Sequence, residues 1–224
     1  MKKVLFGLVA LSSLAFADTN LYLRTGIDFN GKYEEINLGE GALHHKDGDG
    51  TGYEFAIEVT KNIDENIELG LGIAYQDHGK IDGRKVFEPI DEQNSYYTEF
   101  NFDDYQSIPV YLTGKLTIPT KYDIKPYLKM DLGYSFNFGL DSLSTYNEDK
   151  ENGVMHKYPY SVSLDLKDGL YFGFGAGFEY DNFTMDLMYK INKADVAYSD
   201  LDIDVEKPID YSRVTLSFGY KFNF

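Results

Sequence analysis

Eight stretches of this chain alternate between apolar and polar residues, and this pattern limits what the chain can fold into. The stretches span residues 21–29, 52–59, 67–75, 108–118, 126–138, 170–180, 183–191 and 213–224. Successive side chains of a strand point to opposite faces of a sheet, so each stretch predicts a strand with one apolar face. The apolar faces comprise 44 positions without a charge, although 26% of the chain is charged and about 11 charges would be expected. The pattern therefore predicts strands whose apolar face meets hydrocarbon, where a Lys or Arg costs about 2–4 kcal/mol at mid-bilayer.

The connections between these stretches alternate between short and long. Residues 60–66, 119–125 and 181–182 form the short ones, and residues 30–51, 76–107, 139–169 and 192–212 form the long ones. Short turns at one end and long loops at the other are typical of outer-membrane barrels. We therefore expect an all-β fold, an eight-stranded antiparallel up-and-down transmembrane β-barrel with long extracellular loops. A ten-stranded barrel stays open as an alternative, with the two further strands in residues 82–101.

The N-terminus predicts export from the cytoplasm. Lys2 and Lys3 are followed by the uncharged, mostly apolar run 4–16, and Ala15-Phe16-Ala17 is an A-x-A cleavage site. These are the parts of a signal peptide, and the run is too short for a spanning helix. The alternative is an N-terminal core segment. We expect residues 1–17 to be the signal peptide and residues 18–224 to be the barrel domain.

Composition excludes several classes of protein. The chain has no cysteine, so it has neither a disulfide framework nor a lipid-modified N-terminal cysteine. Loss of Lys2 and Lys3 changes the net charge from −16 to −18, and such a chain has no electrostatic attraction for nucleic acid. Beyond residue 16, no apolar run approaches the roughly 20 residues of a spanning helix. The expected surroundings are outer-membrane lipid, with the protein as a monomer.

The polar faces of the predicted strands carry thirteen charges, six positive and seven negative. They are Arg24, Asp28, Glu54, Glu58, Glu68, Lys115, Lys129, Asp131, Glu179, Asp186, Lys190, Arg213 and Lys221. Side chains just fill the interior of an eight-stranded barrel, and charges inside must pair or be hydrated. The favoured interpretation is a packed ion network that closes the interior. The alternative is a narrow, selective pore that these charges line.

The last strand carries a resemblance to a known family. In residues 214–224, Val214, Leu216, Phe218, Tyr220, Phe222 and Phe224 alternate with small or polar residues. Together with the signal peptide, the eight alternating strands and the alternation of short and long loops, this strand resembles the OmpA/OmpX-type small outer-membrane barrels. The resemblance implies that the barrel-assembly machinery is a partner during biogenesis and reads a signal made of Leu216, Phe218, Tyr220, Phe222 and Phe224. OmpA continues into a peptidoglycan-binding domain, which we do not expect here because the sequence stops at this strand.

The long loops carry 25 acidic and 10 basic residues. They are either simply solvated or an acidic surface for divalent cations or for basic host or matrix partners. Alternation continues at residues 158–166 and 201–205, which predicts strands that project beyond the membrane. In OmpX-like barrels a protruding sheet edge is thought to support binding to foreign surfaces, so the resemblance implies adhesion.

Metal binding and catalysis have weaker support. Asp47-Gly-Asp49-Gly-Thr51-Gly52 with Glu58 nearly matches an EF-hand loop, but Thr51 replaces Asp or Asn and residues 52–59 alternate as a strand. Weak surface cation candidates remain; they are Asp47, Asp49, Asp200, Asp202, Asp204 and Glu206. The four histidines are expected in loops, without a pairing to a strand serine; they are His44, His45, His78 and His156.

We therefore predict a non-enzymatic surface barrel without a cofactor, acting in envelope integrity or in adhesion to host or matrix. The first alternative is a narrow porin or small-ligand carrier. The second is a lipid A-modifying enzyme, which would commonly use a serine with a histidine.

Overall fold

The computed structural model describes residues 18–33, 48–49, 51–81, 85–89, 95–102, 104–139, 141–151, 154–200 and 203–224. The predicted signal peptide, residues 1–17, lies outside this part of the chain. Among the described residues, no helix has the length and apolar character needed to cross a membrane.

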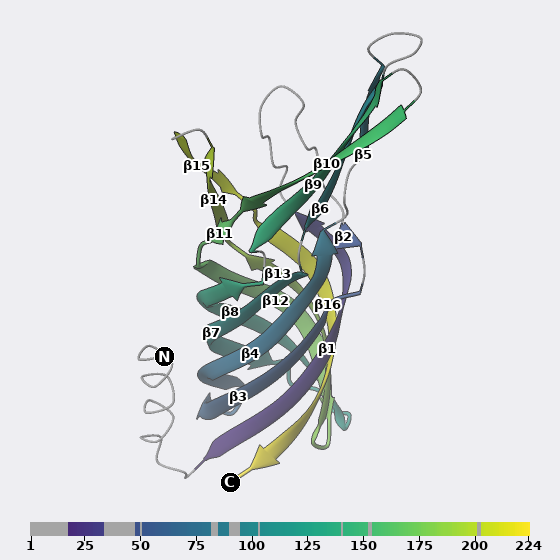
Figure 1. Ribbon diagram of the computed structural model, residues 1–224. Coiled ribbons are helices and arrows are strands. Elements are labelled where there is room, and N and C mark those ends of the chain that lie inside the picture. Colours follow the sequence, from purple (N-terminus) through teal and green to yellow (C-terminus); the bar gives the residue numbers. More distant parts are fainter. Residues whose placement is uncertain are drawn as a thin grey trace.

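Eight antiparallel strands close into a barrel in which every strand pairs with its neighbours along the barrel sequence (Figure 1). Closure comes from the pairing of the last strand with the first and of β4 with β7. The prediction of an eight-stranded up-and-down barrel is confirmed. Its strands are β1 (Thr19–Tyr33), β3 (Tyr53–Asp64), β4 (Ile67–Ile81), β7 (Asp104–Thr117), β8 (Ile124–Phe138), β12 (Gly169–Tyr180), β13 (Phe183–Asn192) and β16 (Tyr211–Asn223).

The predicted alternation follows the barrel wall. Leu112, Met130 and Phe174 point outward and are 61%, 65% and 59% exposed, while the positions between them turn inward. Apolar side chains on the outside and polar ones inside are the reverse of a water-soluble barrel, and they match a wall surrounded by hydrocarbon.

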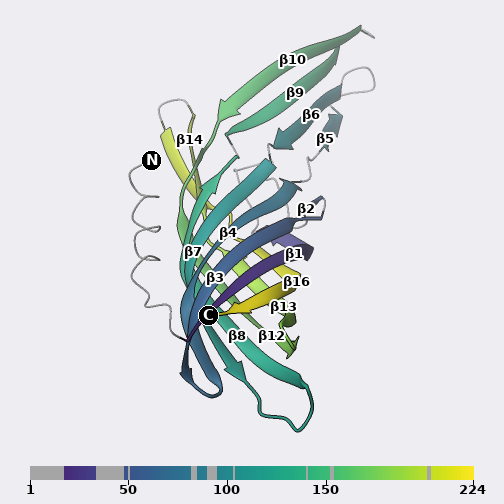
Figure 2. The same ribbon diagram turned by 90° about the horizontal axis from the view of Figure 1, so that it is seen from below.

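Three of the long connections contain strands that leave the barrel at one end, here called the loop end. A projecting sheet, with strand order β10-β9-β6-β5, contains β5 (Lys85–Pro89), β6 (Ser95–Phe102), β9 (Ser142–Glu151) and β10 (Val154–Ser163). It extends away from the barrel in both views (Figure 1, Figure 2). The ten-stranded alternative is wrong, because β5 pairs with β6 and β6 pairs with β9, and neither enters the barrel.

A second, smaller sheet at the loop end is here called the cover sheet. It contains β11 (Asp165–Leu166), β14 (Asp195–Asp200) and β15 (Ile203–Pro208) in the order β11-β14-β15. The short strand β2 (Gly48–Asp49) pairs with the end of β4. At the opposite end, here called the turn end, the β12–β13 connection has two residues, as predicted, and the β3–β4 connection also has only two, because β3 runs further than the alternation predicted.

A bulge near the loop end of β1 changes which residues face inward. Asn30 takes a positive φ of 52°, a conformation that Asn tolerates, and the register with β16 shifts between Phe29 and Lys32. Inward positions are even-numbered from Asn20 to Asp28, whereas beyond the bulge the buried residue is Tyr33. The bulge thus places a tyrosine ring inside the mouth of the barrel.

Two glycines of the wall offer a matched test of strand packing. A Cβ on Gly133 would lie 2.2 Å from the backbone oxygen of Val110 and 2.6 Å from Cα of Tyr111, on the adjacent strand. A Cβ on Gly114 would meet the end of the Leu69 side chain at 3.3 Å and the backbone oxygen of Met130 at 4.0 Å, an ordinary contact distance. We expect Gly133→Ala to lower the free energy of unfolding by about 1–3 kcal/mol, since β7 and β8 must separate.

The control Gly114→Ala should change stability by less than about 0.5 kcal/mol. The free energy of unfolding of both variants can be measured by urea unfolding of the refolded barrel in detergent micelles. The folded fraction at each urea concentration is read from the mobility of the unheated protein on a gel. Equal losses in the two variants would contradict the packing argument.

Candidate functional site

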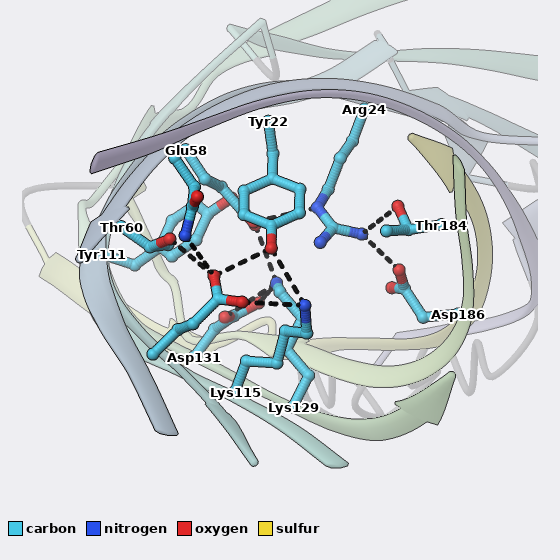
Figure 3. A network of polar contacts seen from close by, with 12 residues as sticks. Tyr22, Arg24, Glu58, Thr60, Tyr111, Lys115, Lys129, Asp131, Thr184 and Asp186 are labelled. Atoms are coloured by element: carbon cyan, nitrogen blue, oxygen red, sulfur yellow. Dashed lines mark hydrogen bonds and ion pairs between the residues drawn. The ribbon is translucent and has the colours of Figure 1, made fainter. Parts of the chain in front are cut away.

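The candidate site is the polar interior of the barrel. Figure 3 shows Arg24, Lys115 and Lys129 pointing from three different strands toward the centre. All thirteen charges predicted for the interior lie there, twelve of them buried and Lys221 half-buried. Each takes part in at least one ion pair. These pairs separate into three groups along the barrel axis.

The lower cluster, nearest the turn end, holds two cations and two anions. Lys115 Nζ lies 3.0 Å from Glu68 and also pairs with Glu179. Lys221 Nζ contacts the same two carboxylates at 3.1 and 3.4 Å. The Tyr22 hydroxyl accepts a hydrogen bond from Lys115 at 2.9 Å and donates one to Glu68 at 2.8 Å. The four charges balance, so this layer needs no counterion.

The middle cluster holds two cations and three anions. Arg24 pairs with Glu58 at 2.9 Å and with Asp186. Lys129 Nζ lies 2.8 Å from both Glu58 and Asp131. Two tyrosines donate further hydrogen bonds to carboxylate oxygens of these pairs: Tyr127 to Asp186 at 2.9 Å, and Tyr111 to Glu58 at 3.0 Å. Glu58 is therefore an interior ion-pair partner, which removes it from the EF-hand-like loop.

The upper cluster, toward the loop end, again balances two cations with two anions. Arg213 Nε lies 2.8 Å from Asp28, and Lys190 pairs with Glu54. Arg213 also lies 3.9 Å from Glu54 and donates to Asn192 Oδ1 at 2.6 Å. The three clusters together fill successive levels of the interior with paired charges.

An uncharged hydrogen-bond chain lies above the upper cluster. Gln76 Nε2 donates to the Glu54 carboxylate at 2.7 Å, so Gln76 Oε1 faces away and accepts from Ser107 at 3.0 Å. Asn192 Nδ2 donates to Ser107 Oγ at 3.1 Å. The chain ends at His78, whose Nε2 lies 2.7 Å from Ser107 Oγ. All of these side chains are buried.

The mouth cluster closes the loop end of the interior. Its buried members are Tyr33, Tyr105, Ala194, Val196, Ile209 and Tyr211, and Leu164 and Leu166 pack against them. The cluster therefore joins three barrel strands to the cover sheet. The surface pair of Lys167 with Asp165 raises the pKa of Lys167 through their hydrogen bond and charge attraction, but exposed pairs stabilise little. Apolar packing holds the cover sheet down together with Asn137 of β8, whose side-chain N–H groups donate to the carbonyls of Lys167 and Lys193 at 3.0 and 3.2 Å.

Two features of the interior were missed from the sequence. Tyrosines 22, 111, 127 and 171 are buried inside, although their inward position in the alternation was a usable signal. The expectation that all four histidines lie in loops is wrong for His78, because β4 runs on to Ile81 and carries it inside. There it pairs with a strand serine, Ser107. His44 and His45 lie outside the described residues, and the His156 side chain is not described.

The surface cation candidates stay predictions. Asp47 and Asp202 lie outside the described residues, and the side chains of Asp49, Asp200 and Asp204 are not described. Within the described part of the chain, no group of three or more His, Asp or Glu side chains could hold a metal ion.

The terminal strand presents its predicted signal residues on the outer face. Phe218, Tyr220 and Phe222 are 48%, 36% and 39% exposed, and Leu216 is half-exposed. Phe224 follows the end of β16, where its backbone N–H donates to the carbonyl of Thr19 at 3.0 Å. The last strand is therefore anchored along β1 to its final residue.

Similar proteins are known at the level of family, sequence and structure. The family model described as outer membrane protein beta-barrel domain matches residues 4–222. An uncharacterised protein of Pasteurella multocida is 28% identical over 236 residues, which span 99% of this chain and 98% of that protein. The outer membrane protein OprG from Pseudomonas aeruginosa has 15% identity and a TM-score of 0.50, with 93% of this chain and 97% of OprG covered. The attachment invasion locus protein Ail of Yersinia pestis has 14% identity and a TM-score of 0.40, with 92% and 99% covered.

Proposed function

The chain belongs to the outer membrane protein beta-barrel domain family, and we propose that it is a closed, non-enzymatic barrel that carries an adhesive sheet on the cell surface. The family places the barrel in the bacterial outer membrane, surrounded by lipid, with its long loops outside. The loop end is then the outer end and the turn end is periplasmic.

The projecting sheet is the observation that carries the proposal. Four strands from two different loops pair into one sheet beyond the barrel, so its shape does not depend on a single flexible hairpin. Among the described strands, β5 and β10 each pair on one side only. A strand edge with unpaired N–H and C=O groups can accept an extended segment of another protein by strand addition. A projecting open edge suits contact with a host or matrix surface.

A loop exchange tests the adhesion proposal. Residues 82–103 and 143–162 would each be replaced by a short Gly-rich turn, which removes the projecting sheet but keeps the cover sheet. Cells of a non-adherent laboratory bacterium displaying each form would be counted on laminin-coated wells and on cultured epithelial monolayers. We expect binding to fall to the level of cells without the barrel. Unchanged binding would overturn the proposal, and so would absence of binding by the unaltered protein.

A matched control separates adhesion from folding. Replacing residues 199–204 at the tip of the β14–β15 hairpin shortens a different outer loop and leaves the projecting sheet intact. Both variants should keep the unheated gel mobility of the folded barrel. Only the first should lose binding.

The rival function is a narrow pore, and the three charge clusters argue against it. Steady conductance requires a continuous water path, whereas the described interior is crossed by ion pairs at three levels. We expect the purified barrel to give no steady single-channel conductance in a planar bilayer. Stable, ohmic steps in the unaltered protein would contradict the closed interior.

The enzyme alternative loses support from the direction of the histidine–serine contact found among the described residues. Ser107 gives its proton to Gln76 Oε1, so His78 Nε2 is the donor toward Ser107 Oγ. A general base would have to accept the serine proton instead. Both side chains are also sealed beneath the mouth cluster and face away from membrane lipid.

We also propose three further properties of this protein. The mature protein begins at Asp18, which intact-mass measurement of the exported form would test. The outer face of β16 serves as the signal for the assembly machinery. The barrel acts as a monomer.

A further inference from the structure

The outer mouth contains a buried histidine that has one unused nitrogen, and we propose that it is an acid-responsive latch. When the His78 ring gains a second proton, the cover sheet lifts from the mouth of the barrel. This inference concerns the mouth cluster and stands whether or not the projecting sheet is adhesive.

His78 is enclosed by aromatic rings. Its ring centre lies 4.5 Å from that of Tyr105 and 4.6 Å from that of Tyr211, and the side chain is 1% exposed. Nε2 contacts Ser107 Oγ at 2.7 Å, whereas Nδ1 is buried without a hydrogen-bond partner. The two tyrosines belong to the mouth cluster that carries Ala194, Val196 and Ile209 of the outer loops.

The surrounding hydrogen bonds fix the neutral tautomer of this ring. Arg213 donates to Asn192 Oδ1, so Asn192 Nδ2 must be the donor to Ser107 Oγ. Because Ser107 donates its own proton to Gln76, its oxygen can only accept from His78. The proton of the neutral ring is therefore on Nε2, and Nδ1 is a bare lone pair. A lone pair can be buried at moderate cost, but an added N–H⁺ there requires an acceptor.

Among the described residues, the carboxylates that neighbouring charges link to the surroundings of His78, Asp28 and Glu54, already have cation partners. These partners are Arg213 and Lys190, both of which repel a third positive charge. On β4 itself, the neighbouring Asp77 accepts from Gly79 N at 3.0 Å and from Gln106 at 3.4 Å. The titratable and charged groups on the elements packed around the ring are Tyr33 and Asp28 on β1, Glu54 on β3, Asp77 on β4, Asp104 and Tyr105 on β7, Lys190 on β13, Asp210 directly before β16, and Tyr211 and Arg213 on β16.

No polar atom of the described residues makes a hydrogen bond with Nδ1 in the closed mouth, so we expect water to accept the new Nδ1–H. The faces of Tyr105 and Tyr211 can stabilise an imidazolium by cation–π attraction, but they accept no in-plane hydrogen bond from Nδ1. Water reaches the ring only if the rings above it separate. Since those rings carry the cover sheet by apolar packing, protonation favours the open mouth.

The absence of cysteine makes a labelling test direct. Val196→Cys places a thiol in the mouth cluster, where Val196 is 5% exposed. Ser163→Cys places a matched thiol on the exposed end of β10. In lipid nanodiscs, both thiols would be labelled with a dithiodipyridine reagent, which reacts with thiols also in acid. The measured quantity is the labelling rate at position 196 divided by the labelling rate at position 163. We expect this ratio to rise about tenfold from about pH 7.5 to about pH 5.

His78→Phe in both cysteine backgrounds is the decisive control. It keeps a ring between the two tyrosines and removes the titrating nitrogens, so the ratio should stay low at both pH values. A flat ratio with His78 present would overturn the latch, as would an equal rise in His78→Phe. Imidazole ¹⁵N NMR of the cysteine-free protein gives a second check: at about pH 7.5 the neutral ring should carry its proton on Nε2, and a proton on Nδ1 would also overturn the proposal.

Discussion

Arg24→Met is expected to lower the free energy of unfolding of the barrel by about 3–5 kcal/mol, because it leaves a buried anion pair without its cation. Arg24 is the contact that joins Glu58 on β3 to Asp186 on β13 across the interior. Replacing a whole buried ion pair by apolar groups can be neutral, but removal of one partner is not. The middle cluster already carries one more anion than cation, and the variant raises this excess to two. Urea unfolding in lipid vesicles measures the loss.

Two further variants identify the cause. Lys61→Met removes a cation from an exposed position of β3 and should change stability by less than about 0.5 kcal/mol. Adding Asp186→Asn to Arg24→Met restores the original charge excess and should recover part of the loss. No recovery in the double variant would mean that packing of the arginine stem, and not charge balance, explains its effect.

Leu112→Arg is expected to lower the free energy of unfolding by about 2–4 kcal/mol, because it exposes a guanidinium to hydrocarbon in the middle of the wall. Leu112 lies between Leu71 of β4 and Leu132 of β8 in the strand register, and it points outward. No interior carboxylate is available on that face, so the charge must reach the interface or distort the bilayer. Urea unfolding in lipid vesicles measures this loss of stability.

The matched control is Ile118→Arg. Ile118 is also outward-facing, at 45% exposed, but it follows the end of β7 at the periplasmic rim. An arginine there reaches water and should cost only about 0–1 kcal/mol. Equal effects at the two depths would show that the wall is not embedded as the barrel requires.

The number of strands and the outward face of each strand could be predicted from the sequence. Along each strand of a membrane barrel, apolar and polar side chains alternate with a period of two residues, and only one choice of outward face keeps the charges away from lipid. The exclusion of charge from positions such as Leu132 and Phe174 is a direct consequence of the hydrocarbon outside. The pairing of Arg24 with Glu58 and Asp186 could not be read in the same way, because it depends on barrel closure and on which side chains share a level.

The loop end shows where the pattern stops being informative. The bulge at Asn30 changes the inward parity of β1, so the burial of Tyr33 contradicts a simple continuation of the alternation. The strand β4 extends past the last apolar outward residue and carries His78 inside. The joining of β6 with β9 depends on two loops meeting in space, which no local periodicity encodes.

A nitroxide scan of β7 tests whether the barrel is a closed cylinder with its ions inside and its apolar side chains in lipid. Single cysteines at positions 108–117 would be labelled in lipid vesicles, and collision with oxygen and with a water-soluble nickel chelate measured at each. We expect high oxygen and low nickel collision at Ile108, Val110, Leu112, Gly114 and Leu116, with the intervening positions protected from oxygen. Strong nickel collision at Leu112, or a profile without a two-residue period, would contradict it.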